Sequence, residues 1–477
     1  MSRARGLIEK TFENQLNEED YKSFLKELLK EFEEKPFEYH GVYIPEAYRD
    51  YIESFKRIGK FKDASDKEID LLIVYLKRGT SLVRARSAQR NFVAWYLREK
   101  LKDAALVAFA VKDYPDWRFS LVKVDYGFSE SGAVERRIAP AKRYSYLVGQ
   151  NEGTHTVQSR FLPLLEKREK PTLKELEEAF SVEPITDEFY KEYRNLFIRT
   201  VEELNKLLKS NPALKKEFEA KGIESVGFAK KLLGQIVFLY FLQKKGWFGV
   251  ERGKPWGSGP RDFIRRLFNK EYGDYQNFYN DILEPLFYEA LRTDRSADDH
   301  YYSRFNCRIP FLNGGLFDPP NNFDWVNVDI LLPNELFSNE NEDGILDVLD
   351  RYNFTVNEEE PLDKEVALDP ELLGKIYEKL NAIRSDNFDE YVRVLKSGKK
   401  GDETKFNKEY GVYYTPREIV HYMCQESLIN YLENGVAGRV KREDIEKFVR
   451  YADLFLENEI TAVEKRGKIE RGEQKET

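Results

Sequence analysis

The sequence is poor in the residues that build disulfide frameworks and metal clusters. Its 477 residues include two cysteines and four scattered histidines. So few cysteines exclude a disulfide scaffold and a cysteine-rich zinc module, and the histidines leave little for a histidine metal site. We therefore expect no structural metal centre.

The sequence also lacks a long apolar run. The longest is LLGQIVFLYFL, Leu232–Leu242, which is flanked by lysine pairs. A membrane-spanning helix needs about 20 apolar residues, so this run predicts a buried helix within 228–250 and no membrane segment. The first residues, Met1–Arg5, lead into a charged stretch with no secretory pattern, so we expect a cytoplasmic protein.

An excess of positive charge is missing too. The chain has 77 basic and 85 acidic side chains, a net charge of -8. A small protein that coats DNA would be basic overall. Any contact with DNA must therefore use a local basic face.

Short β-rich runs at 70–77, 105–111 and 117–126 surround a stretch of helical period at 82–101. Helical patterns dominate afterwards, beginning with a capping box of Thr172 and Glu175. These patterns predict an α+β protein with a small mixed α/β unit followed by a mainly α-helical region. The expected domains are an N-terminal unit at 1–165, a helical region at 166–395, a linker at 396–411 and a final segment at 412–477.

The most specific stretch is GVYYTPREIVHYMCQESLINYL, residues 411–432. Thr415 is suited to cap a helix, Pro416 suits the first helical position, and Glu418 completes a capping box with Thr415. Taken alone, this is a well-capped helix start and carries no function.

The full wording resembles the opening motif of N6-adenine DNA methyltransferases of the Eco57I-like (type IIG) and related restriction-modification families. In those enzymes a Tyr-Thr-Pro segment begins the catalytic domain and borders the S-adenosylmethionine site. The resemblance thus implies cofactor-binding roles for Tyr414, Thr415 and Pro416, and double-stranded DNA as partner. It extends to four upstream stretches, 81–97, 228–250, 306–319 and 368–382.

Two parts of the family pattern are absent after Tyr414. Such enzymes need a glycine-rich turn against the cofactor and an Asn-Pro-Pro-Tyr loop that holds the flipped adenine, because the amine is inaccessible within the base stack. Neither occurs here. We expect 412–477 to be the start of a truncated methyltransferase domain, inactive and without cofactor by itself. The rest of the methyltransferase would then be supplied elsewhere, as continuing sequence or as a separate chain.

The N-terminal unit leaves several functions open. Glu68, Asp70 and Lys77 flank a strand, as in a Mg²⁺-dependent nuclease spanning 66–126, and Gln89 lies on a following helix. However, Tyr75 occupies the position where such nucleases prefer an acid. The alternatives are an active nuclease, a degenerate relic, or a structural or DNA-gripping unit, with Gln89 then a satisfied core amide.

Arginines in the same region are candidate DNA contacts. Arg84, Arg86 and Arg90 lie on the predicted helix, and Lys142-Arg143 follows later. Arginines off the apolar face can bind phosphates, although a solvated charged face is equally consistent. A DNA-binding or phage-defence accessory module is therefore the competing interpretation for the whole chain.

Limited proteolysis tests the predicted linker. Residues 396–411 are rich in Lys, Gly, Asp and Glu and have little to bury, so we expect the first cut there. Initial cutting within 228–250 would contradict the buried helix.

Overall fold

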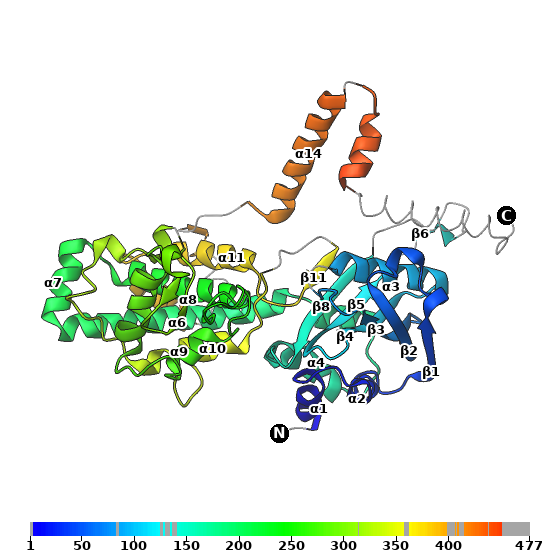
Figure 1. Cartoon of the computed structure of the whole chain (residues 1–477), viewed down its shortest axis with the longest axis horizontal. Helices are drawn as coiled ribbons and strands as arrows, with labels where there is room; N and C mark the ends of the chain where they lie inside the picture. Colours follow the sequence, from blue (N-terminus) through cyan, green and yellow to red (C-terminus); the bar gives the residue numbers. More distant parts are fainter. Residues whose placement is uncertain are drawn as a thin grey trace. The chain divides into compact units, whose positions relative to one another are not determined.

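The computed structural model describes residues 3–450, except 83–84, 125–126, 129–133, 136–140, 313, 357–361, 398–405, 407, 410–414 and 437. The chain forms two compact units. Unit 1 contains 1–181, 359–366 and 415–477, and unit 2 contains 182–358 and 367–414. The mixture of a sheet with many helices confirms the expected α+β class (Figure 1).

Unit 1 is built on a seven-stranded mixed sheet. Its neighbours pair antiparallel, except for the parallel pairs β3–β4 and β8–β11. The strands, in sheet order, are β1 (Glu33–His40), β2 (Ile52–Lys62), β3 (Glu68–Leu76), β4 (Ala104–Val111), β5 (Asp116–Lys123), β8 (Lys142–Gly149) and β11 (Asp363–Glu365).

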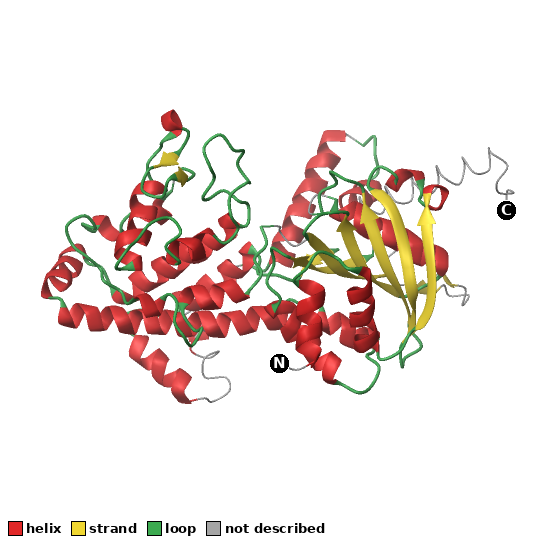
Figure 2. Ribbon diagram, turned by 60° about the horizontal axis from the view of Figure 1, so that its bottom comes forward, coloured by secondary structure: helices red, strands yellow, loops and turns green. Residues whose placement is uncertain are grey.

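Helices lie on both faces of this sheet (Figure 2). Helix α3 (Arg86–Lys100) connects the parallel strands β3 and β4 and packs its buried residues on one face. The other face is covered by α1 (Arg3–Phe12), α2 (Glu18–Leu29) and α4 (His155–Glu166), whose aromatic rings contact the strand residues Trp117 and Phe119. The predicted strands and the predicted helix within 66–126 are therefore confirmed.

Unit 1 extends past the border expected at residue 165. Helix α5 (Leu173–Ala179) begins with the predicted capping box, in which Thr172 and Glu175 satisfy each other's backbone N–H groups. Its end is fixed to the sheet, since the Tyr146 hydroxyl donates a hydrogen bond to the Ala179 carbonyl 2.5 Å away.

Strand β11 comes from a distant part of the sequence and is held by buried ion pairs. Arg143 on β8 contacts Asp363 at 2.9 Å, and neither side chain is exposed to solvent. Arg118 on β5 contacts Glu365 at 3.0 Å, with side chains 0% and 6% exposed. The paired charges offset each other's desolvation, which neither would tolerate alone.

Hydrogen bonds to one backbone carbonyl and two side chains supplement these ion pairs. Arg118 donates through Nε to the Leu82 carbonyl at 3.1 Å and through Nη1 to Ser145 Oγ at 3.1 Å. Arg143 also donates to the Gln89 side chain at 2.5 Å. A three-residue strand with little apolar surface is thereby fixed by charge-assisted hydrogen bonds, which are stronger than neutral ones.

Unit 2 is mainly helical and surrounds the apolar helix α8 (Ser225–Gln243). This helix is long and apolar enough to cross a membrane, but 67% of its apolar window is buried inside the protein, as predicted. Gly234 permits the close approach of α11 (Pro370–Asn381), because a Cβ there would lie 1.7 Å from the Tyr377 hydroxyl. The other described α-helices of unit 2 include α6 (Glu183–Ser210), α7 (Pro212–Lys221), α9 (Phe263–Phe268), α10 (Ile345–Arg351) and α12 (Phe388–Ser397).

Glu284 lies in the core of unit 2 between two π-helical segments, Tyr279–Leu283 and Leu286–Ala290. It is fully buried. Burial, and secondarily the charges of Asp329 and Asp281, raise the pKa of its carboxyl to about 9. The side chain is therefore neutral at neutral pH.

Replacement of Asp363 with alanine should destabilise unit 1 strongly. The change leaves Arg143 buried without its carboxylate, and breaking a buried pair in this way costs about 3–5 kcal/mol. Denaturant unfolding followed by circular dichroism measures the loss. Asp66→Ala, at an exposed surface pair, should change stability far less. Equal losses in the two variants would contradict the role of the buried pair.

The stability of unit 2 should fall as pH rises from about 5 to about 8. Because the folded pKa of Glu284 is raised to about 9, the folded state keeps a proton that the unfolded state releases above its ordinary pKa of 4.5. The loss approaches about 1 kcal/mol per pH unit. Glu284→Gln should remove most of this slope in thermal or denaturant unfolding. An unchanged slope would show that other groups cause it.

Candidate functional site

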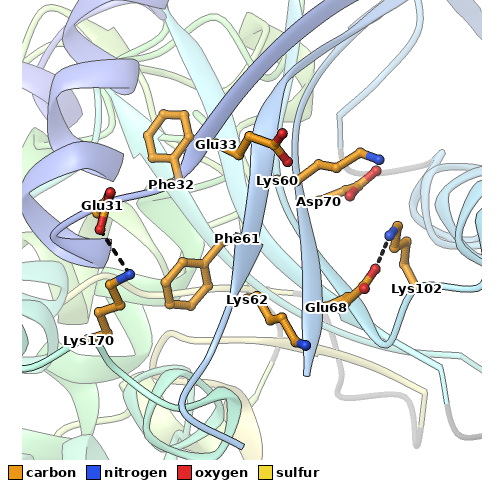
Figure 3. A pocket seen from close by; sticks show the side chains of 10 residues that line it. All are labelled: Glu31, Phe32, Glu33, Lys60, Phe61, Lys62, Glu68, Asp70, Lys102 and Lys170. Carbon is orange, nitrogen blue, oxygen red and sulfur yellow. Dashed lines mark hydrogen bonds and ion pairs between the residues drawn. The ribbon is translucent and has the colours of Figure 1, made fainter. Parts of the chain in front are cut away.

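A cavity of about 500 Å³ lies in unit 1 beside the start of β3 (Figure 3). Two phenylalanines lie among side chains of both charge signs around it. Strands β2 and β3 supply half of the lining residues, and the others come from the end of α2 into β1, from the segment after α3 and from the segment before α5. The lining residues are Glu31, Phe32, Glu33, Lys60, Phe61, Lys62, Glu68, Asp70, Lys102 and Lys170.

Ion pairs neutralise several of these charges at the cavity wall. Lys170 contacts Glu31 at 3.1 Å, and Lys102 contacts Glu68 (Figure 3). Lys62 reaches the exposed Asp66 at 2.8 Å. Glu68 and Asp70 are two residues apart on β3 and point to the same face of the sheet, the face that α3 covers.

Asp70 is the most deeply buried acid in this cavity wall, at 1% exposure. Its Oδ2 accepts a hydrogen bond from the Tyr96 hydroxyl of α3 at 2.6 Å. Its Oδ1 has no hydrogen-bond partner among the described residues. Burial, and secondarily the charge of Asp70, raise the pKa of the Tyr96 hydroxyl far above its ordinary value, so the tyrosine keeps its proton.

The structure does not bring the predicted nuclease residues together. Lys77 follows the far end of β3, about 23 Å from Asp70 at 3.3 Å per residue. They are also an odd number of positions apart, seven, so side chains along an extended strand at these positions point to opposite faces. Tyr75, where a nuclease would carry an acid, donates instead to Glu18 at 2.8 Å. Glu68, Asp70 and Lys77 therefore do not form one site.

Gln89 is the satisfied core amide that was one of the two interpretations. It is completely buried, donates to the Leu82 carbonyl at 3.1 Å and accepts from Arg143. Arg143, a candidate phosphate contact in the sequence, is likewise completely buried. Arg143 forms an ion pair with Asp363, which lies far away in the sequence. This pairing is visible in the fold and not in the local sequence.

The three candidate DNA-binding arginines differ in their placement. Arg84 lies outside the described residues. Arg86 begins α3 and is partly buried. Arg90 is 1% exposed and donates to Asn91 Oδ1 at 3.1 Å, which is at odds with a phosphate contact. Residues four apart lie on the same side of a helix, so both arginines face inward here.

The candidate cofactor segment precedes helix α14 (Arg417–Val436). Thr415 and Pro416 are exposed, whereas Tyr414 and the side chain of Glu418 lie outside what the structure describes. The Pro416 carbonyl accepts the first hydrogen bonds of the helix, from the backbone N–H groups of Ile419 and Val420. A helix therefore begins where the sequence predicts one.

Beside this helix start lies a shallow hollow of about 480 Å³ with a mostly apolar wall. It is lined by Thr415, Val420, Met423, Cys424 and Ser427. Among the described residues, no group of three or more His, Cys, Asp or Glu side chains is placed to hold a metal ion.

Comparison with known proteins places the chain near restriction-modification enzymes. It is 31% identical over 272 residues to a protein of Methanocaldococcus jannaschii named "Putative type II restriction enzyme and methyltransferase". The match covers 52% of this chain and 19% of that protein, so the chain corresponds to a minor part of its relative. No protein-family model and no solved structure matches the chain. The chain is thus related to a restriction-modification protein.

Arg90→Ala should act on stability and not on DNA binding. Removing a large buried side chain leaves a cavity and unpaired neighbours, for which a loss of about 2–5 kcal/mol is typical. The exposed Lys100 on the same helix provides the matched control, and Lys100→Ala should change stability by less than about 0.5 kcal/mol. Thermal unfolding and DNA titration of both variants distinguish a role of Arg90 in stability from a role in DNA binding. A stable Arg90→Ala protein with weakened DNA binding would restore the phosphate role.

Proposed function

We propose that this chain is the N-terminal part of an adenine-specific DNA methyltransferase of a restriction-modification system, of the type IIG kind. In the complete enzyme, S-adenosylmethionine would donate a methyl group to adenine N6 in double-stranded DNA. The chain described here would supply the N-terminal units and the first helix of the methyltransferase domain. The cofactor turn and the adenine-binding loop would belong to the rest of that domain.

The observation that carries the proposal is the uncovered apolar surface of α14. Several of its apolar side chains are about half exposed or more, with Ile419 at 50%, Met423 at 58% and Tyr431 at 75%, although Ile429 is fully buried. Other exposed apolar side chains on the helix are Val420, Tyr422 and Leu428. These residues are spread around the whole helix, and a helix that is apolar on all sides is normally buried. Such an exposed apolar surface indicates that another domain or protein packs against it.

The sequence at the start of α14 indicates which domain would cover this apolar surface. Thr415 and Pro416 belong to the motif that resembles the opening of N6-adenine methyltransferases, where the following helix packs against the cofactor domain. The relative from Methanocaldococcus jannaschii is much longer than the matched part and carries methyltransferase in its name. Both observations favour a methyltransferase core as the cover of α14.

If the present chain binds DNA, we expect the binding to show little preference for any base sequence. The net charge is -8, so attraction must come from local cations such as Arg84. Phosphate contacts carry no sequence information, and their affinity falls steeply with salt. A DNA-binding or phage-defence accessory module remains the second candidate, favoured by the well-packed core of unit 1, which does not need α14.

A methyl-transfer assay tests the proposal. The chain alone should bind S-adenosylmethionine negligibly and transfer no labelled methyl group to DNA, because it has no glycine turn for the cofactor. Together with the polypeptide encoded directly downstream of Thr477, it should form N6-methyladenine. Met423→Glu should reduce that activity by placing a charge in the covered surface, whereas Glu443→Gln, at an exposed residue of the helical stretch 442–450, should not.

The opposite results have distinct meanings. Micromolar cofactor binding and methyl transfer by the chain alone would overturn the proposed division of the domain. A downstream polypeptide with no effect on methylation, and no contact with α14, would favour the accessory module.

A further inference from the structure

Glu284 is a buried acid in unit 2 that the proposed function does not use. Its side chain is completely buried between two π-helical segments, and neither oxygen forms a hydrogen bond of ordinary geometry with the described residues. The Tyr279 hydroxyl is close enough to favour the ionised carboxyl slightly, but it bonds to the Tyr288 hydroxyl at 3.3 Å. Burial raises the pKa of both tyrosines, so they stay neutral. Such a buried polar group is costly, and π-helical turns frequently mark functional sites.

An irregular segment, residues 324–332, lies against these π-helical turns. It contains no helix or strand. The side-chain amide of Asn277 donates to the Leu332 carbonyl at 2.7 Å, and the Asn280 side chain accepts from the Ile330 backbone N–H at 3.2 Å. Irregular segments of this kind open locally at a lower cost in free energy than the helices beneath them. Opening of this segment would let water reach the turns that contain the buried acid.

The charges around Glu284 oppose its ionisation. Asp329, an exposed residue of the segment 324–332, and Asp281, on the first π-helical turn, both act on it. Arg304 acts on Asp281 from the other side and donates to the Asp281 carbonyl at 2.6 Å. Because burial and these two acids raise the pKa of Glu284 to about 9, the carboxyl keeps its proton while the segment covers it. Once water reaches the carboxyl, its pKa returns toward the ordinary 4.5 and the proton is released.

We propose that Glu284 and the segment 324–332 form a proton-dependent latch, closed when the carboxyl is protonated and opened when it ionises. The closed state binds one proton more than the open state, so acid favours closure. The equilibrium constant for opening should therefore rise about tenfold per pH unit between about 5 and about 9. Opening exposes Ile330 and Leu332, which are fully buried in the closed segment. An apolar surface of unit 2 thus becomes accessible as pH rises, independently of any methyltransferase role.

Amide hydrogen exchange of the full chain, followed by mass spectrometry, tests the latch. Division of the measured rates by the intrinsic rates of an unstructured peptide gives the opening equilibrium at each pH. In peptides that cover 324–332 this equilibrium should rise about tenfold per pH unit from about pH 5. Peptides of α8 should open far less at every pH, because the latch leaves the helical core folded. Glu284→Gln cannot ionise, so its opening equilibrium at 324–332 should not change with pH.

Two surface variants complete the test. Asp329→Asn removes one of the charges that oppose ionisation, so the rise in opening should level off at a lower pH than in the unchanged chain. Because Asp329 is exposed, this variant tests the latch even if Glu284→Gln is unstable. Glu335→Gln, at an exposed acid just after the segment, should reproduce the unchanged curve. A rise that persists in folded Glu284→Gln, or that Asp329→Asn leaves unaltered, or equal opening of 324–332 and α8, would overturn the latch.

Discussion

Two arginines without access to solvent hold the edge of the sheet in unit 1. Arg143 and Arg118 each contact a carboxylate of β11, and Gln89, Ser145 and the Leu82 carbonyl complete their hydrogen bonds. Remove β11, and two guanidinium groups remain buried without counter-charges. The start of α3, the strands β5 and β8, and the returning segment 359–366 are therefore fixed by one network rather than by apolar packing alone.

The same side of the sheet contains a second polar region at the other end of α3. There Tyr96 orders Asp70, and Glu68 pairs with Lys102. The first network is closed, since each of its arginines meets a carboxylate inside the protein. The second borders a cavity, and one carboxylate oxygen of Asp70 has no hydrogen-bond partner among the described residues. The polar groups of the first network are paired within the fold, whereas the second keeps a buried polar atom without a partner.

Local patterns predicted the strands of unit 1, helix α3 and the buried helix α8, because each buries apolar residues at a regular period. They could not predict β11, whose Asp-Lys-Glu sequence has no apolar period and whose partners lie far away. For the same reason Arg90 and Arg143 looked like surface cations, since burial of an arginine depends on where its carboxylate lies. The pairing of Glu68 and Asp70 was visible in the sequence, but the direction of Lys77 required the register of β3.

The distant origin of β11 has a consequence for the order of synthesis. The hydrogen bonds between Arg143 and Asp363 join residues 220 positions apart. At roughly 5–20 residues per second, a ribosome needs roughly ten seconds or more to pass from one to the other. During this time the emerging sheet has an unpaired edge at β8 and two uncompensated arginines. The sheet of unit 1 would thus stay incomplete, and accessible to chaperones, until most of unit 2 has left the ribosome.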